Sequence, residues 1–338
     1  MKRLLLMLFA CCGKLAEANS AWNLKGRTAV VTGGSKGIGR GVVEELLEQG
    51  CRVITCARDC GPLDSLLCEV NSQISSECVS SAQREEPGLP RLIALPLDVS
   101  TGEGVDALVA CVEEHFQGRL DILVNNVGTN VRKAAEDFSD AEYDLLMRTN
   151  LDAAFHLSRK CLRFLSASNP KRRSRCTSER NDDSADAHGG GGDGDAVIAA
   201  SDADDAGGGD GVVGGCVVNI GSISGETVDN TGCPYHMAKA AMNHMTRYLA
   251  CEWGPSPHAV RVNCVAPWFI ATPLTEPILK GAFASAVDRA TPLRRVGTTQ
   301  EVARVVSFLC MEASSYVSGQ VVTVDGAFTC DGFRYENP

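Results

Sequence analysis

Seven short apolar runs alternate along the chain with segments that carry apolar residues at helical spacing. The runs occupy residues 28–32, 52–57, 92–97, 122–124, 216–220, 261–265 and 321–324. Most of them are continuously apolar, which is typical of strands that helices cover on both faces. The alternation predicts one α/β domain built on a doubly wound parallel sheet of about seven strands. The 338 residues, 44% of them apolar, are enough to bury one such core.

A glycine-rich turn follows the first apolar run. Residues 32–39 read TGGSKGIG, and apolar residues then recur at helical spacing from Val42 to Leu47. This combination suits a dinucleotide, because glycines let a pyrophosphate approach the backbone and the helix N-terminus attracts its negative charge. An ordinary tight turn is the alternative interpretation. The candidate contacts in the turn are Thr32, Gly33, Ser35, Lys36, Gly37, Ile38 and Gly39.

Tyr235 and Lys239 are four residues apart, and Ser222 stands thirteen residues before the tyrosine. On a helix, a spacing of four places both side chains on the same face. An ammonium group beside a phenol can lower the pKa of the phenol from its usual value of about 10. The reduction of a carbonyl group needs such an acid. For the tyrosine alone, the alternative is a buried aromatic ring with a satisfied hydroxyl.

The order of these motifs resembles that of the short-chain dehydrogenase/reductase family, and in detail its tropinone reductase-like branch. The resemblance is carried by residues 22–27, 32–39, 125–130, Asn150, Ser222, Tyr235 with Lys239, 265–268 and 319–329. The matching stretches follow the family's order from residue 22 to 335, apart from one insert. They imply a Rossmann-type catalytic domain over residues 21–335 and an NADP-dependent oxidoreductase that acts on CH–OH or C=O groups.

The resemblance also implies a catalytic role for four residues. Tyr235 would protonate the oxygen of a ketone while hydride passes from the nicotinamide to the carbonyl carbon. Lys239 would lower the pKa of the phenol and hold the nicotinamide ribose, and Ser222 would donate a hydrogen bond to the same oxygen. Asn150 would hold a water that links the lysine to solvent. The expected substrate is a small cyclic or hydrophobic ketone, or the alcohol, and the expected assembly is a homodimer or homotetramer.

Two cations indicate the form of the cofactor. The second apolar run ends before Arg58 and lacks the acidic residue that would bind a ribose 2′-hydroxyl, whereas an arginine suits a 2′-phosphate. Lys36 in the glycine turn supplies a second positive charge. NADPH/NADP+ is therefore favoured over NADH, and solvated surface charges are the alternative interpretation of the two residues.

Further cofactor contacts follow from the resemblance alone. They are Asp98, Asn125, Gly128, Tyr235, Lys239, Pro267, Ile270 and Thr272. Asp98 would contact the adenine ring, and Thr272 with the backbone of Ile270 would bind the nicotinamide carboxamide. Helix capping is the alternative for Asp98 and for Thr272. Residues 273–294 resemble the substrate lid of the family.

Residues 168–212 depart from the family pattern. Five basic residues precede a tract that holds nine Asp among Gly and Ala. Such a segment buries too little apolar area to offset its ordering entropy, so we expect it to be disordered. It lies between the helix that ends near Leu165 and the strand that starts near Cys216, at the amino ends of the strands and away from catalysis. A plain surface insertion is favoured over a binding segment for an unknown partner.

The net charge of −10, about half of which the insert supplies, argues against nucleic-acid binding. Sixteen cysteines form no Cys-x-x-Cys pair. Cys51, Cys216, Cys264 and Cys310 fall in expected helices or strands. Buried free thiols are therefore favoured over disulfides, and no metal site is expected.

Residues 1–20 resemble a short signal peptide. Lys2 and Arg3 precede an apolar run from Leu4 to Cys12, and residues 16–18 fit a cleavage site. The run is too short to span a bilayer. The many thiols, and the lack of an Asn-x-Ser/Thr acceptor in the rest of the chain, favour a reducing compartment. The expected location is the cytoplasm, with the endoplasmic reticulum as the alternative.

Two classes of function fit the sequence. The first is an NADPH-dependent carbonyl reductase, and the second is an NADP-binding regulatory or scaffold protein on the same fold. The set of Asn150, Ser222, Tyr235 and Lys239 favours the enzyme, because a scaffold has no chemical need for these residues. Within the enzyme class, a 3-oxoacyl-thioester reductase is the alternative to a tropinone reductase-like enzyme.

Overall fold

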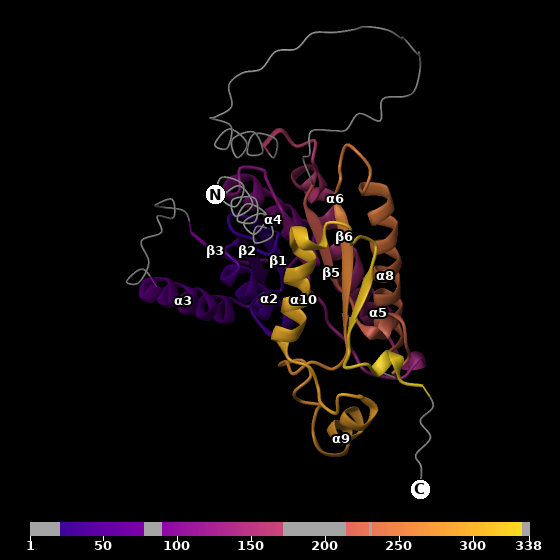
Figure 1. Ribbon diagram of the computed structural model, residues 1–338. Coiled ribbons are helices and arrows are strands. Elements are labelled where there is room, and N and C mark those ends of the chain that lie inside the picture. The colour runs from indigo at the N-terminus through magenta and orange to yellow at the C-terminus, as the bar shows by residue number, and fades with distance from the viewer. Residues whose placement is uncertain (1–20, 78–89, 172–213, 230–231, 333–338) are drawn as a thin grey trace, which may run out of the picture.

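A computed structural model describes residues 21–77, 90–171, 214–229 and 232–332 of the protein. Seven parallel strands form one sheet in the order β3-β2-β1-β4-β5-β6-β7 (Figure 1). The strands are β1 (Thr28–Thr32), β2 (Arg52–Ala57), β3 (Leu92–Pro96), β4 (Ile122–Asn125), β5 (Cys216–Ile220), β6 (Arg261–Pro267) and β7 (Val321–Val324). The predicted doubly wound parallel sheet is confirmed, and each strand begins at the residue expected from the sequence.

Helices cover both faces of this sheet. They are α2 (Gly37–Glu48), α3 (Cys60–Glu77), α4 (Gly102–His115), α5 (Asp140–Met147), α6 (Ala153–Leu165), α8 (Cys233–Trp253), α9 (Gly281–Ala290) and α10 (Thr299–Cys310). Residues of α2 and α10 share a core cluster with Val31 of β1, whereas α4, α6 and α8 share a second cluster with Val30. Successive strand residues point to opposite faces, so both faces of β1 are buried and its sequence is continuously apolar.

The strand order changes direction at β1 and β4, from which the chain builds outwards to opposite edges of the sheet. In doubly wound sheets, ligands bind in the crevice at the carboxyl ends of the strands beside such a switch point. Residues 32–39 follow β1, residues 125–130 follow β4, and Ser222 follows β5. Because these strands are parallel, the fold brings the three motifs to one edge.

A π turn at residues 148–152 interrupts the helical segment that ends at Leu165. The chain forms α5, widens through Arg148–Asp152 and continues as α6. Ser139 begins α5 with a capping box to Glu142. A π turn inserts one extra residue into a helix and frequently marks a functional site. In this chain it contains Asn150.

The two segments that the sequence sets apart lie mostly outside the described residues. Residues 1–20 lie outside them, and only 168–171 of the predicted insert are described. In that short piece, Nδ2 of Asn169 donates to the carbonyl oxygen of Gly118 at 2.9 Å. The N–H of Gly215 donates to the carbonyl oxygen of Leu165 at 2.7 Å, so the flanks of the insert meet at the amino end of β5. Ser222 lies at the opposite end of that strand.

Buried thiols are a feature of the core. Cys51, Cys216, Cys264 and Cys310 are all buried and free, as the sequence predicts. In the described part of the chain, no group of three or more His, Cys, Asp or Glu residues is placed to hold a metal ion. No helix among the same residues has the length and apolar character to cross a membrane.

Candidate active site

The turn between β1 and α2 requires glycine at two positions, Gly37 for its backbone conformation and Gly39 for lack of space. Gly37 has a φ of 57°, which glycine adopts without strain. A Cβ on Gly39 would lie 2.2 Å from the carbonyl oxygen of Gly33 and 2.3 Å from Nδ2 of Asn126. The bare backbone of this turn is therefore open to the close approach of a pyrophosphate.

The N-terminus of α2 is suited to a phosphate group. Lys36 is the N-cap, its side chain makes no capping bond, and the first turn contains no acidic residue. The first N–H groups of a helix have no intrahelical partner and carry the positive end of its dipole. The tight glycine turn and this uncapped helix end together fit a dinucleotide, so residues 32–39 could hold its pyrophosphate.

Asn126 supports the glycine turn, a role that the sequence reasoning missed. Its Nδ2 donates to the carbonyl oxygens of Thr32 at 2.9 Å and Gly33 at 3.2 Å. The neighbouring Asn125 is buried, and its Nδ2 donates to Oδ1 of Asn219 at 2.8 Å. Asn125 thus cross-links β4 to β5, while Asn126 fixes β4 to the turn. The paired asparagines after the fourth strand were the available signal.

The two cations expected to select NADPH lie in different surroundings. Arg58 is exposed at the end of β2. Nζ of Lys36 lies 3.1 Å from Oδ2 of Asp59, and both of these side chains are exposed. The sequence reasoning did not consider Asp59, which stands one residue beyond Arg58. A carboxylate therefore lies beside the cations that would bind a 2′-phosphate.

Ser222 and Tyr235 meet between β5 and α8. Ser222 begins the short 3-10 helix Ile223–Gly225 (η3), and its Oγ accepts from the N–H of Ser224 at 3.1 Å. Tyr235 stands in the first turn of α8, where Pro234 is compatible with the unbonded N–H positions of a helix start. The hydroxyl of Ser222 acts on that of Tyr235 as a hydrogen-bonding neighbour.

Burial raises the pKa of the Tyr235 phenol above its usual value. The hydrogen bond with Ser222 lowers this pKa, the carboxylate of Asp229 raises it, and the charge of Arg132 lowers it. Nζ of Lys239 lies 5.7 Å from the centroid of the tyrosine ring. The pKa is raised, not lowered as the sequence led us to expect, because desolvation of the phenol outweighs the nearby positive charges.

Lys239 is buried beneath the tyrosine, with only 3% of its surface exposed. Its Nζ donates to the carbonyl oxygen of Ile220 at 2.7 Å. Burial lowers the pKa of the ammonium group to about 8, against a smaller raising effect of Cys264. A lysine with such a pKa can carry a charge at neutral pH and still exchange its proton.

The depressed pKa of Lys239 predicts a pH dependence of stability. Between pH 8 and 10.5 the unfolded chain keeps the proton that the folded protein has released. The free energy of unfolding therefore rises with pH across this window, by about 3 kcal/mol from this group. We expect the rise to be absent in Lys239→Met. The measurement is urea denaturation of both proteins, under reducing conditions, from pH 7 to 10.5.

The comparison of the two proteins isolates the lysine. Burial raises the pKa of the Cys51 and Cys56 thiols to about 12, so these groups oppose the rise above pH 9 in both proteins alike. Curves of unfolding free energy that run parallel from pH 8 to 10.5 would contradict the assignment.

Asn150 is fully buried in the π turn. Its Nδ2 donates to the carbonyl oxygens of Leu146 and Thr129, both at 2.9 Å, and its Oδ1 accepts from the N–H of Thr129 at 3.0 Å. A Cβ on Gly128 would lie 2.9 Å from Oδ1 of Asn150 and 3.7 Å from Nζ of Lys239. The amide and the ammonium group thus border the same bare stretch of backbone after β4.

Asp98 stands after β3 and makes a local turn. Its Oδ1 accepts from the N–H of Ser100 at 2.9 Å and from the hydroxyl of Ser100 at 2.7 Å. The residue that caps α4 is Thr101, whose side chain accepts from Gly104. The carboxylate of Asp98 therefore does not act as the helix cap that was its alternative role.

The start of the lid touches the glycine turn. A Cβ on Gly37 would lie 3.4 Å from Thr272, so these two segments meet although they are far apart in the sequence. The N–H of Thr272 donates to Oγ1 of Thr275 at 3.1 Å, in a turn that precedes α9. Pro267 ends β6, and Ile270 forms an isolated bridge with Gly297. The residues expected to bind the carboxamide thus lie beside those expected to bind the pyrophosphate.

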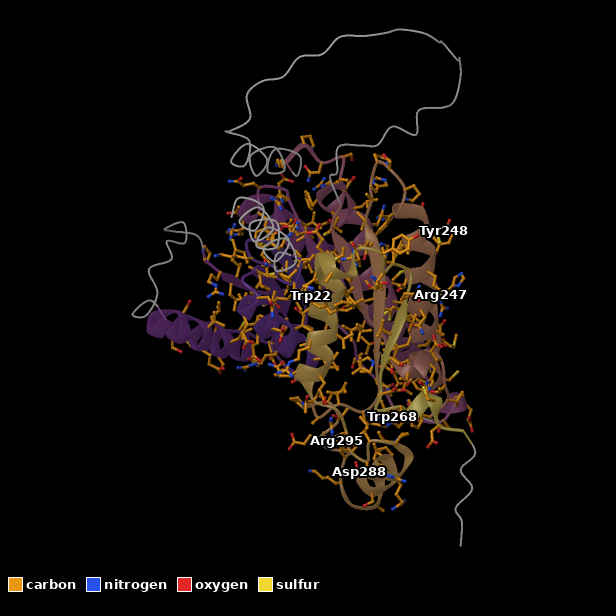
Figure 2. All side chains as sticks on the ribbon, in the orientation of Figure 1. Trp22, Arg247, Tyr248, Trp268, Asp288 and Arg295 are labelled. Atoms are coloured by element: carbon orange, nitrogen blue, oxygen red, sulfur yellow. The ribbon has the colours of Figure 1, made fainter. Side chains whose placement is uncertain are left out.

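Helix α9, within the segment 273–294 that was expected to form a lid, stands apart from the sheet (Figure 1). Trp268 lies between the sheet and α9 (Figure 2). Its Nε1 donates to Oγ1 of Thr291 at 3.1 Å, and its ring stacks on Phe328 with centroids 3.9 Å apart. These contacts hold the C-terminal end of α9 against the segment that follows β6.

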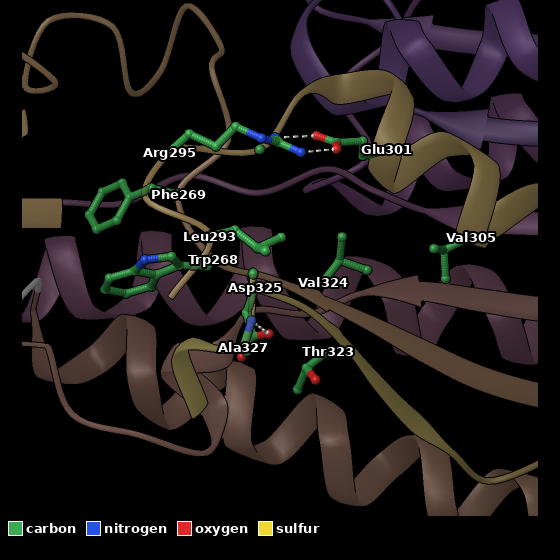
Figure 3. Close-up of a pocket in the computed structure, with 12 residues that line it drawn as sticks. Trp268, Phe269, Leu293, Arg295, Glu301, Val305, Thr323, Val324, Asp325 and Ala327 are labelled. Carbon is green, nitrogen blue, oxygen red and sulfur yellow. Dashed lines mark hydrogen bonds and ion pairs between the residues drawn. The ribbon is translucent and has the colours of Figure 1, made fainter. Parts of the chain in front are cut away.

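A cavity of about 340 Å³ opens beside Trp268 (Figure 3). It is lined by Trp268, Phe269, Leu293, Arg295, Gly297, Glu301, Val305, Thr323, Val324, Asp325, Gly326 and Ala327. Arg295 and Glu301 form an ion pair at 2.6 Å at its border. The cavity includes none of the four residues expected to be catalytic, so it is separate from the site around Tyr235.

Comparison with known proteins gives consistent results. A family model described as short chain dehydrogenase matches residues 27–173, and one described as enoyl-(acyl carrier protein) reductase matches residues 210–329. A tropinone reductase homolog of Arabidopsis thaliana is 38% identical over 94% of this chain and 98% of its own length. Senescence-associated protein 13 of the same plant is 37% identical over 96% and 97%.

Solved structures share the fold. The crystal structure of gox2181 has a TM-score of 0.68 and 28% identity, and the match covers 92% of this chain and 98% of that one. A short-chain type dehydrogenase/reductase from Mycobacterium marinum has a TM-score of 0.68 and 24% identity, with 92% and 99% covered. The similarity therefore extends over nearly the whole of each chain.

Proposed function

Because the chain belongs to the short-chain dehydrogenase/reductase family of oxidoreductases, we propose that it is an NADPH-dependent carbonyl reductase acting on a small cyclic or hydrophobic ketone. The observation that carries this proposal is the grouping of Asn150, Ser222, Tyr235 and Lys239 around the carboxyl ends of β4 and β5. Relatives named tropinone reductase homologs support a ketone as the substrate.

The chain's own residues supply the acid for this reaction. A bound nicotinamide supplies the hydride for the carbonyl carbon. Tyr235 donates its phenolic proton to the carbonyl oxygen, and the hydroxyl of Ser222 orients that oxygen by a hydrogen bond. The raised pKa of the phenol keeps it protonated at neutral pH, the state that reduction needs. The ammonium group of Lys239 stabilises the phenolate that remains. Asn150 holds the backbone beside the lysine, where a water would return the proton to Tyr235.

Residues along the carboxyl edge would hold the cofactor. The glycine turn over residues 32–39 suits the pyrophosphate, and Arg58 with Lys36 suits the 2′-phosphate of NADPH. Asp98 would contact the adenine, and Ile270 with Thr272 would bind the carboxamide. The uncapped start of α2 and the exposed Arg58 support this arrangement.

Arg58 and Asp59 should act on the cofactor preference in opposite directions. We expect Arg58→Ala to weaken NADPH binding about tenfold or more, because a charged contact to the 2′-phosphate is lost. Asp59→Asn frees Lys36 from a carboxylate at 3.1 Å and should strengthen NADPH binding. Since that pair is exposed, the gain should be about two- to fivefold. The measurement is the Kd of NADPH and of NADH, by nicotinamide fluorescence at low and high salt.

The binding of NADH serves as the internal control, because it lacks the 2′-phosphate. Glu69→Gln is the control for charge. Like Asp59→Asn it removes one negative charge, in this case from α3, and it should leave the ratio of the Kd values of NADPH and NADH unchanged. Equal effects of Arg58→Ala on both cofactors would contradict the preference for NADPH.

Apolar lid residues support a compact hydrophobic substrate. Leu274 and Phe283 are exposed around α9, where a bound ketone could cover them. A 3-oxoacyl-thioester reductase is the second candidate, favoured by the match of residues 210–329 to an enoyl-(acyl carrier protein) reductase model. We also propose a homo-oligomer, either a dimer or a tetramer, because β7 is an edge strand whose side chains stay partly exposed.

A turnover screen tests the proposal. NADPH oxidation is followed with cyclic ketones, including tropinone, and with 3-oxoacyl thioesters at equal concentrations. We expect turnover of at least one cyclic ketone and little with the thioesters, and the reverse would favour the second candidate. Binding of NADPH without turnover of any carbonyl compound would favour a regulatory or scaffold protein.

A further inference from the structure

A circuit of contacts links Ser222 to Tyr235 through residues outside the catalytic set. Oγ of Ser224 donates to Oδ2 of Asp229 at 2.9 Å, and Nε2 of His236 lies 2.9 Å from Oδ1 of Asp229. The N–H of Ser224 donates to Oγ of Ser222 at 3.1 Å. His236 directly follows Tyr235, whose hydroxyl is bonded to Ser222. The circuit therefore closes on both catalytic hydroxyls.

Both ring nitrogens of His236 have polar partners. Nδ1 lies 3.0 Å from the carbonyl oxygen of Gly232, and Nε2 lies 2.9 Å from the carboxylate of Asp229. The N–H of Asp229 also donates to Nε2 at 3.4 Å. The side chains of Asp229 and His236 are 10% and 15% exposed, so both groups are largely shielded from solvent.

We propose that Ser224, Asp229 and His236 are positioning residues that hold Ser222 and Tyr235 at the separation needed for proton transfer to the substrate. The inference rests on the proposed carbonyl reductase. Residues 226–229 belong to no helix or strand. Backbone bonds to the carbonyl oxygen of Ile223 hold Glu226 and Thr227, whereas side-chain contacts hold Asp229. The two carboxylate oxygens of Asp229 contact Ser224 on one side of the connection and His236 on the other.

Asp229 also acts on the phenol through its charge. Its carboxylate raises the pKa of Tyr235, whereas Arg132, in the segment after β4, lowers it. The other titratable groups around the phenol are Lys239, at 5.7 Å from the ring centroid, and His236, whose ring centroid is 6.3 Å away. Reduction needs the protonated phenol, so activity falls as the pH rises through the pKa of Tyr235. Removal of the carboxylate charge should move this fall to lower pH.

Asp229→Asn tests both effects. We expect kcat/KM for ketone reduction to fall about tenfold, because the two hydroxyls lose their fixed separation. The descending limb of the pH profile should move to lower pH, while the Kd of NADPH stays within about twofold. His236→Gln should lower kcat/KM similarly. The double variant should lose little more than either single variant, because both changes break the same contact.

Glu226→Gln is the matched control. Glu226 lies in the same connection and carries the same charge, but its Oε1 accepts from Asn243 and Arg247. We expect the wild-type pH profile in this variant. Ser224→Ala is the second variant, for use if Asp229→Asn does not fold. This variant breaks one hydrogen bond of the circuit without a change of charge. It should therefore lower kcat/KM without moving the descending limb of the pH profile.

A titration separates this inference from the proposed function. The ionisation of Tyr235 is followed by tyrosinate absorbance, as the difference between each protein and its Tyr235→Phe counterpart, and needs no turnover. A lower midpoint in Asp229→Asn but not in Glu226→Gln supports the inference even if no ketone is reduced. An unchanged midpoint in Asp229→Asn, or losses of kcat/KM that simply add in the double variant, overturns it.

Discussion

Tyr235→Phe should lower kcat/KM for ketone reduction by about 10²- to 10⁴-fold, the usual contribution of a positioned general acid. Phenylalanine keeps the ring and removes only the hydroxyl that bonds to Ser222. The proton for the carbonyl oxygen would then have to come from water, which the site does not orient. NADPH binding should change by less than about threefold, since the phenol is not the main contact of the pyrophosphate or the 2′-phosphate.

The matched control is Tyr248→Phe on the same helix. Tyr248, labelled in Figure 2, is 63% exposed, so its hydroxyl should not affect turnover. The measurements are steady-state NADPH oxidation and fluorescence titration of NADPH for the wild type and both variants. If Tyr235→Phe keeps more than a tenth of the wild-type kcat/KM, Tyr235 is not the proton donor.

The sheet could be predicted because its strands are buried on both faces. A strand such as β1, with Val30 in one core cluster and Val31 in the other, must be apolar throughout, and this signal survives in a single sequence. The proximity of Tyr235 and Lys239 was also predictable, because the two residues share one face of α8 at a spacing that any helix imposes.

The π turn could not be predicted from periodicity. Residues 148–152 continue the apolar pattern of the flanking helices closely enough to be taken for part of one helix. The wider turn depends on bonds between Asn150 and Thr129, which is far from it in the sequence. Tertiary contacts of this kind leave no local signature, and the same holds for the pairing of Lys36 with Asp59.

The direction of the pKa shift of Tyr235 could not be predicted from the sequence either. The sequence shows the neighbouring cation, Lys239, but it does not show how much water the fold removes from the phenol. Desolvation disfavours the charged form of the phenol and outweighs the effect of the nearby positive charge of Arg132. A motif therefore predicts which groups meet, whereas their protonation depends on burial that only the folded chain defines.

Gly39→Ala should be the most damaging small substitution in the cofactor site. The new methyl group would lie 2.2 Å from the carbonyl oxygen of Gly33, a backbone atom that can move only if the turn opens. We expect the free energy of unfolding to fall by about 1–3 kcal/mol, as for an overpacked core. NADPH binding should weaken at least about tenfold, because the N–H groups at the start of α2 lose their arrangement.

Gly102→Ala shows that the effect is one of space and not of glycine chemistry. Gly102 lies in the first turn of α4, and a Cβ there would meet nothing within 4 Å. Gly→Ala in a compatible helical position restricts the unfolded chain and stabilises by about 0.4–1 kcal/mol. The two substitutions should therefore change the urea midpoint in opposite directions. The contrary result is a Gly39→Ala protein that is as stable as Gly102→Ala and binds NADPH normally. The turn would then tolerate a side chain where Gly39 meets Gly33, and the dinucleotide would have to bind elsewhere along the carboxyl edge of the sheet.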